Sequence, residues 1–204
     1  MHAVILAGGK GVRLRPYTTC LPKPLVPIGD RYAILEIILH QLHARGFKRA
    51  TLAIGHLGHL IRAFVGDGKR WGIEVDFADE AEPLGTIGPL LGILDRLPPR
   101  FLVMNGDVLT NLDFADVLLT HGADGAPLTI TTYDRTVKVD FGVLECQHRH
   151  VARFVEKPVL HYAVSMGVYA LERSTLAPYP VGMPFGFDEL VLDLLRRGTP
   201  PASR

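Results

Sequence analysis

Short apolar segments alternate with amphipathic segments across residues 1–107, and this alternation limits the folds that the chain can adopt. Continuous apolar runs are typical of strands buried on both faces, and apolar residues every three or four positions are typical of helices. Strand–helix–strand repeats predict right-handed crossovers and a mostly parallel sheet, so we expect a doubly wound α/β fold. The expected strands are 2–7, 49–55, 73–78 and 100–107, and the expected helices are 33–47, 56–66 and 86–97.

The pattern changes after Pro127, where strand-like segments follow one another with short links. This spacing predicts a smaller, more antiparallel portion beside the parallel core. The expected strands there are 126–133, 140–146, 150–158 and 163–171, followed by a helix over 186–198 and a final loop. In that helix we expect the inward-facing residues to be Leu190, Val191, Leu194 and Leu195.

The composition predicts one soluble domain. A chain of 204 residues suits a single globular unit with a sizeable core. The formal net charge of +1 argues against nucleic acid or a membrane surface as the main partner. Cys20 and Cys146 are far apart in sequence and are expected to be free thiols in the cytoplasm. No apolar run approaches the ~20 residues of a membrane span, and no basic segment opens a signal peptide.

A glycine cluster follows the first expected strand, and its spacing excludes two common nucleotide-binding motifs. In the dinucleotide pattern G-x-G-x-x-G, Gly9 and Gly11 would require a third glycine at Leu14. No acidic residue ends the second strand to bind a ribose. The P-loop requires Ser or Thr after Gly-Lys, but Gly9-Lys10 precedes Gly11. A dinucleotide-dependent oxidoreductase is therefore disfavoured.

The remaining interpretation is a glycine turn whose N–H groups approach phosphate oxygens. Arg13, and with less support Arg15, could neutralise a polyphosphate. Lys23 lies between Pro22 and Pro24, which restrict the backbone that positions it. Asp107 follows the strand 100–107, where ligands bind in open α/β sheets and where a carboxylate suits Mg²⁺.

Two pairs of histidines have a spacing that could bind zinc. His40 and His43, and His56 and His59, have helical i, i+3 spacing. Neither pair has a third ligand nearby in sequence, so zinc is not expected.

Five motifs in order resemble those of the sugar-1-phosphate nucleotidyltransferases, over nearly the whole chain. The segment "LAGGKGVRLRP…PKPL" resembles the family signature GGxGTRLxPLT…PKPL. The others are "EAEPLGTIGPL", "FLVMNGDVLTNLDF", "DFGVLE" and "RFVEKP". The motif "EAEPLGTIGPL" most resembles that of the guanylyltransferases that make GDP-mannose or GDP-heptose, although some uridylyltransferases carry a similar stretch.

The resemblance implies a Rossmann-like sheet of the nucleotide-diphospho-sugar transferase type and a reaction that transfers a nucleoside monophosphate to a sugar 1-phosphate. GTP is favoured over UTP, dTTP and ATP, and Mg²⁺ is the implied cofactor. Residues 1–126 would bind the nucleotide and residues 127–204 the sugar. The implied catalytic residues are Arg13 at the leaving pyrophosphate, Lys23 near the α-phosphate and Asp107 at the metal.

Further binding residues are implied by the same motifs. Those for the nucleotide are Leu6, Ala7, Gly8, Gly9, Gly11, Glu82, Pro83, Gly85 and Thr86. Those for the sugar phosphate are Gly142, Glu156 and Lys157.

The sequence also departs from the family pattern. Val12, Phe141 and Ser165 replace a usual Thr, Tyr and Asn. Family members continue into a G-x-W-x-D-I-G segment whose aspartate is a second Mg²⁺ ligand, and the sequence ends before it, so we expect a missing C-terminal segment. A non-catalytic subunit that binds a nucleotide sugar, or a uridylyltransferase or thymidylyltransferase, therefore stays open. A homo-oligomer is compatible with the resemblance.

Overall fold

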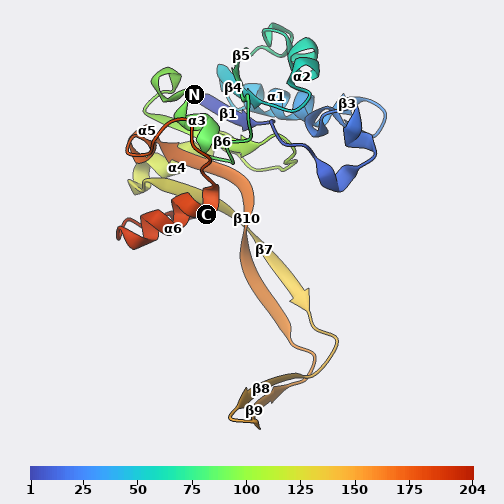
Figure 1. Ribbon diagram of the computed structural model, residues 1–204, viewed down its shortest axis with the longest axis vertical. Coiled ribbons are helices and arrows are strands. Elements are labelled where there is room, and N and C mark those ends of the chain that lie inside the picture. The colour runs from blue at the N-terminus through green and yellow to red at the C-terminus, as the bar shows by residue number, and fades with distance from the viewer.

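A seven-stranded sheet forms the centre of the molecule (Figure 1). The computed structural model describes residues 1–204. The strand order is β11-β7-β10-β6-β1-β4-β5. The strands are β1 (His2–Leu6), β4 (Arg49–Ile54), β5 (Glu74–Asp79), β6 (Arg100–Asn105), β7 (Leu128–Lys138), β10 (Val159–Glu172) and β11 (Ala202–Ser203).

The central strands of the sheet are parallel, as expected from the apolar runs. β1 pairs in parallel with both β4 and β6, and β4 pairs in parallel with β5. Ala3, Val4 and Ile5 have no exposed surface, because layers of side chains cover both faces of β1. β10 pairs antiparallel with β6 on one side and with β7 on the other. The α/β, doubly wound prediction is confirmed.

Helices cover both faces of the sheet and form two apolar cores. One core contains the buried residues of α1 (Ile34–Ala44), α2 (Gly58–Val65) and α4 (Phe114–Asp124). The other contains those of α3 (Gly88–Leu91), α5 (Arg173–Leu176) and α6 (Phe187–Arg196). Five residues on one stripe of α1 are buried, as the 3.6-residue period of a helix requires: Ile34, Leu35, Ile38, Leu39 and Leu42. None of the helices combines the length and the apolar character of a membrane span.

Four local expectations were wrong or incomplete. The helix expected over 86–97 is two short turns, α3 and the 3₁₀ helix η5 (Leu94–Arg96), because Gly92 interrupts it. Helix α4 was not predicted, although Asp113 caps it by accepting from the N–H groups of Ala115 and Asp116. Leu195 in α6 is 53% exposed rather than buried. The expected final loop instead contains β11, which pairs in parallel with β7.

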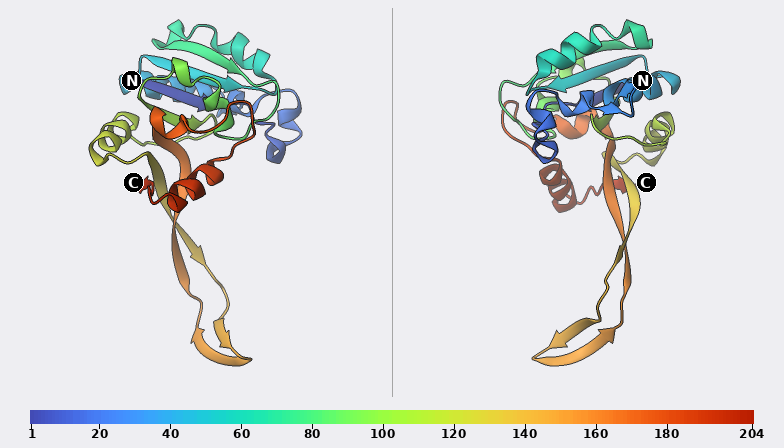
Figure 2. Two further views of the ribbon diagram at one scale, coloured as in Figure 1. Left: turned by 60° about the vertical axis from the view of Figure 1, so that its left-hand side comes forward. Right: turned by 90° about the vertical axis from the view of Figure 1, so that its right-hand side faces the viewer.

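The predicted antiparallel portion extends away from the body as a long ribbon (Figures 1 and 2). β7 and β10 leave the sheet together, and a small sheet of β8 (Val143–Gln147) and β9 (His150–Val155) forms its far end. We call residues 133–163 the arm. A separate hairpin, β2 (Pro27–Ile28) with β3 (Tyr32–Ala33), precedes α1.

Candidate functional site

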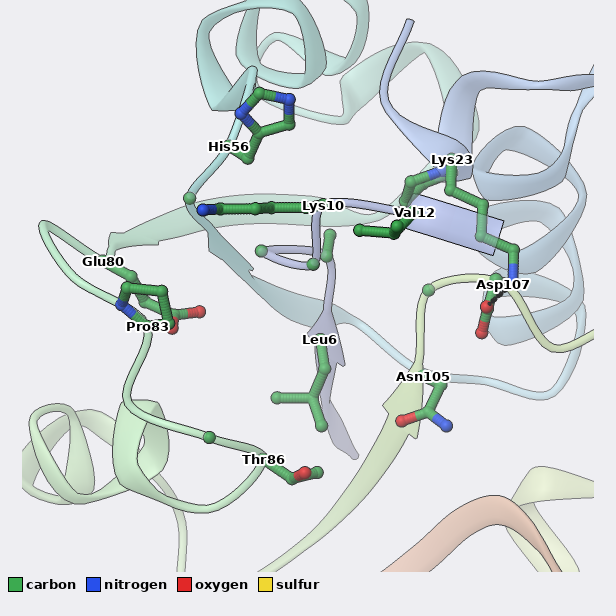
Figure 3. A pocket seen from close by; sticks show the side chains of 18 of the residues that line it. Leu6, Lys10, Val12, Lys23, His56, Glu80, Pro83, Thr86, Asn105 and Asp107 are labelled. Atoms are coloured by element: carbon green, nitrogen blue, oxygen red, sulfur yellow. Dashed lines mark hydrogen bonds and ion pairs between the residues drawn. The ribbon is translucent and has the colours of Figure 1, made fainter. Parts of the chain in front are cut away.

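A cleft of about 810 Å³ lies where the parallel strands end. The residues that line it follow the carboxyl ends of β1, β4, β5 and β6, so four segments distant in sequence meet there. In Figure 3, Leu6 lies in the middle, with Glu80 and Pro83 on one side and Asp107 on the other. This is the edge at which open α/β sheets bind ligands.

Main-chain hydrogen bonds fix the strand ends against one another. The N–H of Gly106 donates to the Leu6 carbonyl oxygen at 2.8 Å. The N–H of Ala7 donates to the Ala53 oxygen at 2.8 Å, and that of Glu80 to the Ile54 oxygen at 2.8 Å. The floor of the cleft therefore continues the hydrogen-bonded sheet and holds the loops above it in place.

Free backbone donors lie at the start of the glycine turn. The N–H groups of Gly8, Gly9, Lys10 and Gly11 donate to no backbone or side-chain acceptor of the protein. Consecutive unpaired N–H groups form a concave site of partial positive charge that suits an anion. This turn, residues 8–11, can therefore hold a phosphate group without any side chain.

The local geometry requires a glycine at position 11 and brings Gly8 close to the Glu80 side chain. Gly11 has φ of +58° and is followed by the 3₁₀ helix η1 (Val12–Leu14), and a Cβ there would lie 2.9 Å from Cγ2 of Thr18. The Thr18 hydroxyl donates to the Gly11 oxygen at 2.8 Å. A Cβ on Gly8 would lie 2.5 Å from Oε1 of Glu80. The turn is thus closely packed on its protein side, and its residues line the cleft on the other.

Cations surround this turn. Arg13 in η1 and Lys23 in the 3₁₀ helix η3 (Lys23–Leu25) both line the cleft, as does Lys10. The Lys23 ammonium donates to the Asp107 carboxylate, and both side chains are about one-third exposed. Arg15, the less supported candidate, is exposed and does not line the cleft.

The segment from Glu82 to Thr86 forms another wall. Glu82, Pro83, Gly85 and Thr86 all line the cleft. The segment is held by Phe185, whose N–H donates to the Leu84 oxygen at 2.9 Å and whose own oxygen accepts from Ile87 at 3.0 Å. All nine predicted nucleotide-binding residues therefore lie around one cleft.

Among the lining residues that were not predicted, four have polar side chains: Lys10, His56, Glu80 and Asn105. Glu80, Asn105 and His56 stand at or just beyond the carboxyl end of a strand, the same signal that located Asp107. Burial raises the pKa of the Glu80 carboxyl, with a smaller opposing effect from a Leu84 N–H hydrogen bond. A carboxyl with a raised pKa thus lies against the glycine turn.

A second cavity of about 690 Å³ meets the cleft at Asp107. It lies between the loop after β6 and the root of the arm. Its lining residues are Asp107, Val108, Leu109, Thr110, Asn111, Tyr133, Val164, Ser165 and Met166. Asp107 therefore stands at the boundary between two spaces that can each hold a ligand.

The three predicted sugar-phosphate residues line neither cavity. Gly142, Glu156 and Lys157 lie on the arm, where a Cβ on Gly142 would be 3.1 Å from Oε2 of Glu156. Lys157 Nζ is 4.0 Å from Oε1 of Glu156. These residues are close to one another, but the β7–β10 ladder extends them away from Asp107.

No group of three or more His, Cys, Asp or Glu residues could hold a metal ion on its own. Asp107 offers one partly exposed carboxylate beside the free N–H groups of the turn. Mg²⁺ commonly binds one or two carboxylates and takes its other ligands from water and substrate phosphates. The donor set fits a magnesium ion that arrives with a phosphate ligand.

Residues 2–179 match the family model described as nucleotidyl transferase. The chain belongs to this family. Mannose-1-phosphate guanyltransferase from Schizosaccharomyces pombe is 37% identical to this nucleotidyl transferase chain over 188 residues, covering 86% of it. Mannose-1-phosphate guanylyltransferase 1 from Arabidopsis thaliana is 35% identical over 188 residues, with the same coverage. The chain spans about half the length of these relatives, 51% of each.

Solved structures share the nucleotidyl transferase fold. HddC from Yersinia pseudotuberculosis superposes with a TM-score of 0.74 at 28% identity, covering all of this chain and 89% of its own. HddC complexed with GMP-PN gives a TM-score of 0.70 at 30% identity, covering 96% of this chain and 85% of its own. The predicted family and the predicted fold type are both confirmed.

Proposed function

We propose that this chain transfers a nucleoside monophosphate from an NTP, with GTP favoured, to a sugar 1-phosphate, which yields an NDP-sugar and pyrophosphate. The observation that carries the proposal is the position of Asp107 and Lys23. Asp107 lines both cavities, and Lys23, which pairs with it, lines the cleft together with the four residues of the glycine turn whose N–H groups are free. Two phosphate-bearing ligands would therefore meet at one charged pair.

The reaction makes one P–O bond and breaks another. An oxygen of the sugar 1-phosphate attacks the α-phosphorus, and the bond from that phosphorus to the bridging oxygen of the β-phosphate breaks with departure of pyrophosphate. Such a transfer depends on positioning and charge neutralisation more than on covalent catalysis. The N–H groups of Gly8, Gly9 and Gly11 would bind nucleotide phosphate oxygens, and Arg13 would bind the leaving pyrophosphate.

Lys23 and Asp107 would act at the α-phosphate. The ammonium of Lys23 would neutralise charge that develops on the transferred phosphate, and Asp107 would hold Mg²⁺. When bound, Mg²⁺ supplies positive charge to the phosphate oxygens. The contact between the two side chains keeps each near the reacting atoms before substrate binds.

The wall from Glu82 to Thr86 would contact the base, and the second cavity would receive the sugar. Guanine is supported by the names of the relatives and by the HddC complex with GMP-PN. Mannose 1-phosphate is supported by the same relatives, and a heptose 1-phosphate is a related candidate. Residues 1–126 would then form the nucleotide-binding part and residues 127–204 the sugar-binding part.

The test is pyrophosphate release with Mg²⁺, crossing GTP, UTP, dTTP and ATP with mannose-, glucose- and heptose-1-phosphates. We expect release with GTP and mannose 1-phosphate, and its loss in Asp107→Asn with GTP binding largely retained. Release with UTP or dTTP alone would make the chain a uridylyltransferase or thymidylyltransferase. If no pair of substrates gave pyrophosphate release while calorimetry detected a bound GDP-sugar, the chain would be a binding subunit and the proposed catalysis would be overturned.

A further inference from the structure

The Asp107 carboxylate has one partner in the protein, the Lys23 ammonium. Lys23 Nζ donates to Oδ2 of Asp107, and neither side chain makes a hydrogen bond or an ion pair with any other group. Both side chains are about one-third exposed, so solvent and ligands reach the pair. A positive charge of the protein therefore lies at the carboxylate that would bind a metal ion.

The backbone segments that carry the two residues are packed directly against each other. A Cβ on Gly106, the neighbour of Asp107, would lie 3.3 Å from Cγ of Pro24, the neighbour of Lys23. The same Cβ would lie 3.0 Å from the Leu6 oxygen, which accepts from the Gly106 N–H at 2.8 Å. The pair therefore opens by rotation of its side chains, and no movement of a loop is needed.

The Lys23 side chain also lies against the glycine turn. Its Cβ is 3.5 Å from the position that a Cβ on Gly11 would take. Residues 8–11, whose N–H groups are free, line the same cleft as Lys23. Because a lysine ammonium is carried on a flexible four-carbon stem, it can turn from Asp107 to a phosphate that is bound at this turn.

A divalent ion and the Lys23 ammonium compete for Asp107. Mg²⁺ binds oxygen ligands, and Asp107 is the one carboxylate that lines both cavities. No cluster of three or more His, Cys, Asp or Glu residues surrounds it to outweigh the ammonium. An ion that approaches the protein without nucleotide therefore has to displace Lys23, against the repulsion between two positive charges.

A polyphosphate at the glycine turn changes this competition. Its several negative charges attract the Lys23 ammonium more strongly than one partly exposed carboxylate does. When the ammonium binds a phosphate oxygen, Asp107 loses its partner and its charge lies beside the charge of the phosphate. The carboxylate then favours a cation, because like charges would otherwise repel each other.

We propose that Lys23 keeps Asp107 closed to free divalent cations and releases it when a polyphosphate binds at the glycine turn. The proposal rests on the proposed function for its ligand, an NTP. Polyphosphate and cation then each raise the affinity of the protein for the other, since both depend on opening the same pair. The protein without nucleotide thus binds a divalent cation weakly, and the nucleotide complex binds it well.

Binding of Mn²⁺ to the protein without nucleotide is the first test. Mn²⁺ takes the same oxygen ligands as Mg²⁺, and electron paramagnetic resonance measures the concentration of the free ion. Lys23→Met removes the charge and keeps a long side chain, so the Kd for Mn²⁺ should fall by about 5–20-fold relative to wild type. Adding Asp107→Asn to this variant should abolish the gain. An equal Kd in wild type and Lys23→Met would overturn the proposal.

Lys10→Met is the matched control for the loss of one positive charge. Lys10 lines the same cleft, but no ion pair joins it to Asp107, and Figure 3 shows the two on opposite sides of the glycine turn. At about 0.15 M salt, screening should keep its Kd for Mn²⁺ within about twofold of wild type. A gain as large as that of Lys23→Met would show that the net charge of the cleft, and not the contact, sets the affinity.

Calorimetry tests the release of Asp107 by nucleotide. The Kd for GTP is measured with EDTA and with saturating Mn²⁺, in wild type and in Lys23→Met. We expect Mn²⁺ to strengthen GTP binding by a factor that is about 5–20 times larger in wild type. The association of Mn²⁺ with free GTP is the same for both proteins and cancels in this comparison. Equal factors in the two proteins would overturn the release.

Neither measurement needs turnover, so each hypothesis can fail by itself. The expected Mn²⁺ and GTP affinities without pyrophosphate release from any substrate pair would contradict the proposed function and support the inference. Pyrophosphate release together with an unchanged Kd for Mn²⁺ in Lys23→Met would support the function and overturn the inference.

Discussion

Lys23 and Asp107, 84 positions apart, touch at the boundary between the cleft and the second cavity. Lys23 lies between Pro22 and Pro24 at the start of a 3₁₀ helix, and Asp107 lies in the turn after a central strand. The pair joins the glycine-rich N-terminal loop to the middle of the sheet. Its position makes it the first target for mutation.

Lys23→Ala should lower pyrophosphate release by about 10²–10³-fold, the usual effect of removing one donor to developing charge. The free energy of unfolding should change by no more than about 1 kcal/mol, because both side chains are partly exposed. Lys69→Ala is the control, since it breaks an exposed ion pair with Asp67 and should leave turnover unchanged. A Lys23→Ala variant with full turnover would remove Lys23 from the reaction.

Gly11→Ala should destabilise the fold, whereas Gly9→Ala should not. At Gly11 the left-handed φ disfavours any Cβ by about 1–2 kcal/mol, and Thr18 crowds it further. We expect Tm to fall by about 2–8 °C in a thermal melt. At Gly9 a Cβ meets nothing within 4 Å, so its Tm should stay close to wild type. Equal Tm values for the two variants would contradict this account of the turn.

Glu80 should make nucleotide binding depend on pH. When charged, its carboxylate repels phosphate from the nearby glycine turn, and because burial raises its pKa above the usual 4.5, it takes up a proton at a higher pH than an exposed glutamate does. Glu80→Gln should therefore bind GTP about 3–10-fold more tightly than wild type at pH 7.5, with the difference shrinking at pH 5. Calorimetry measures the ratio of the two Kd values, in which the titration of GTP itself cancels. Weaker binding by Glu80→Gln would instead make Glu80 an acceptor for the ligand.

His121 should lower stability at acidic pH. It is fully buried, its Nδ1 pairs with the Thr129 hydroxyl at 2.8 Å, and burial lowers its pKa despite the nearby Glu172. The unfolded chain therefore binds the proton first, so stability is lost as pH falls below the usual value of 6.5. Urea unfolding of His121→Gln should show a smaller loss between pH 7.5 and 5.5. His59→Gln, at an exposed position, should keep the wild-type slope.

The parallel core and the residues of the cleft were predictable for a common physical reason. A strand buried on both faces reads as a continuous apolar run, and its carboxyl end marks the ligand edge. That reasoning located Asp107, and its consistent use would also have located Glu80 and Asn105. The contact of Lys23 with Asp107 was not predictable, because it depends on how a loop crosses the sheet edge. Likewise β11 forms by pairing with a strand 73 positions earlier, Ala202 with Thr129, which no local pattern encodes.

The direction in which the arm extends could not be predicted from the sequence either. Its strands were predicted from strand-like segments with short links, but whether a ribbon folds back or projects depends on the long β7–β10 ladder. The same limit explains why Glu156 and Lys157 were expected at the site and lie away from it within one chain.

Main-chain amides at residues 8–11, rather than side chains, offer the free donors of the glycine turn. A side-chain substitution cannot delete such a donor unless it introduces proline or distorts the loop. The groups that would face the base and the sugar are side chains, so single codon changes can alter them. Over evolutionary time, phosphate affinity in this scaffold should therefore persist while preference for a base or a sugar drifts.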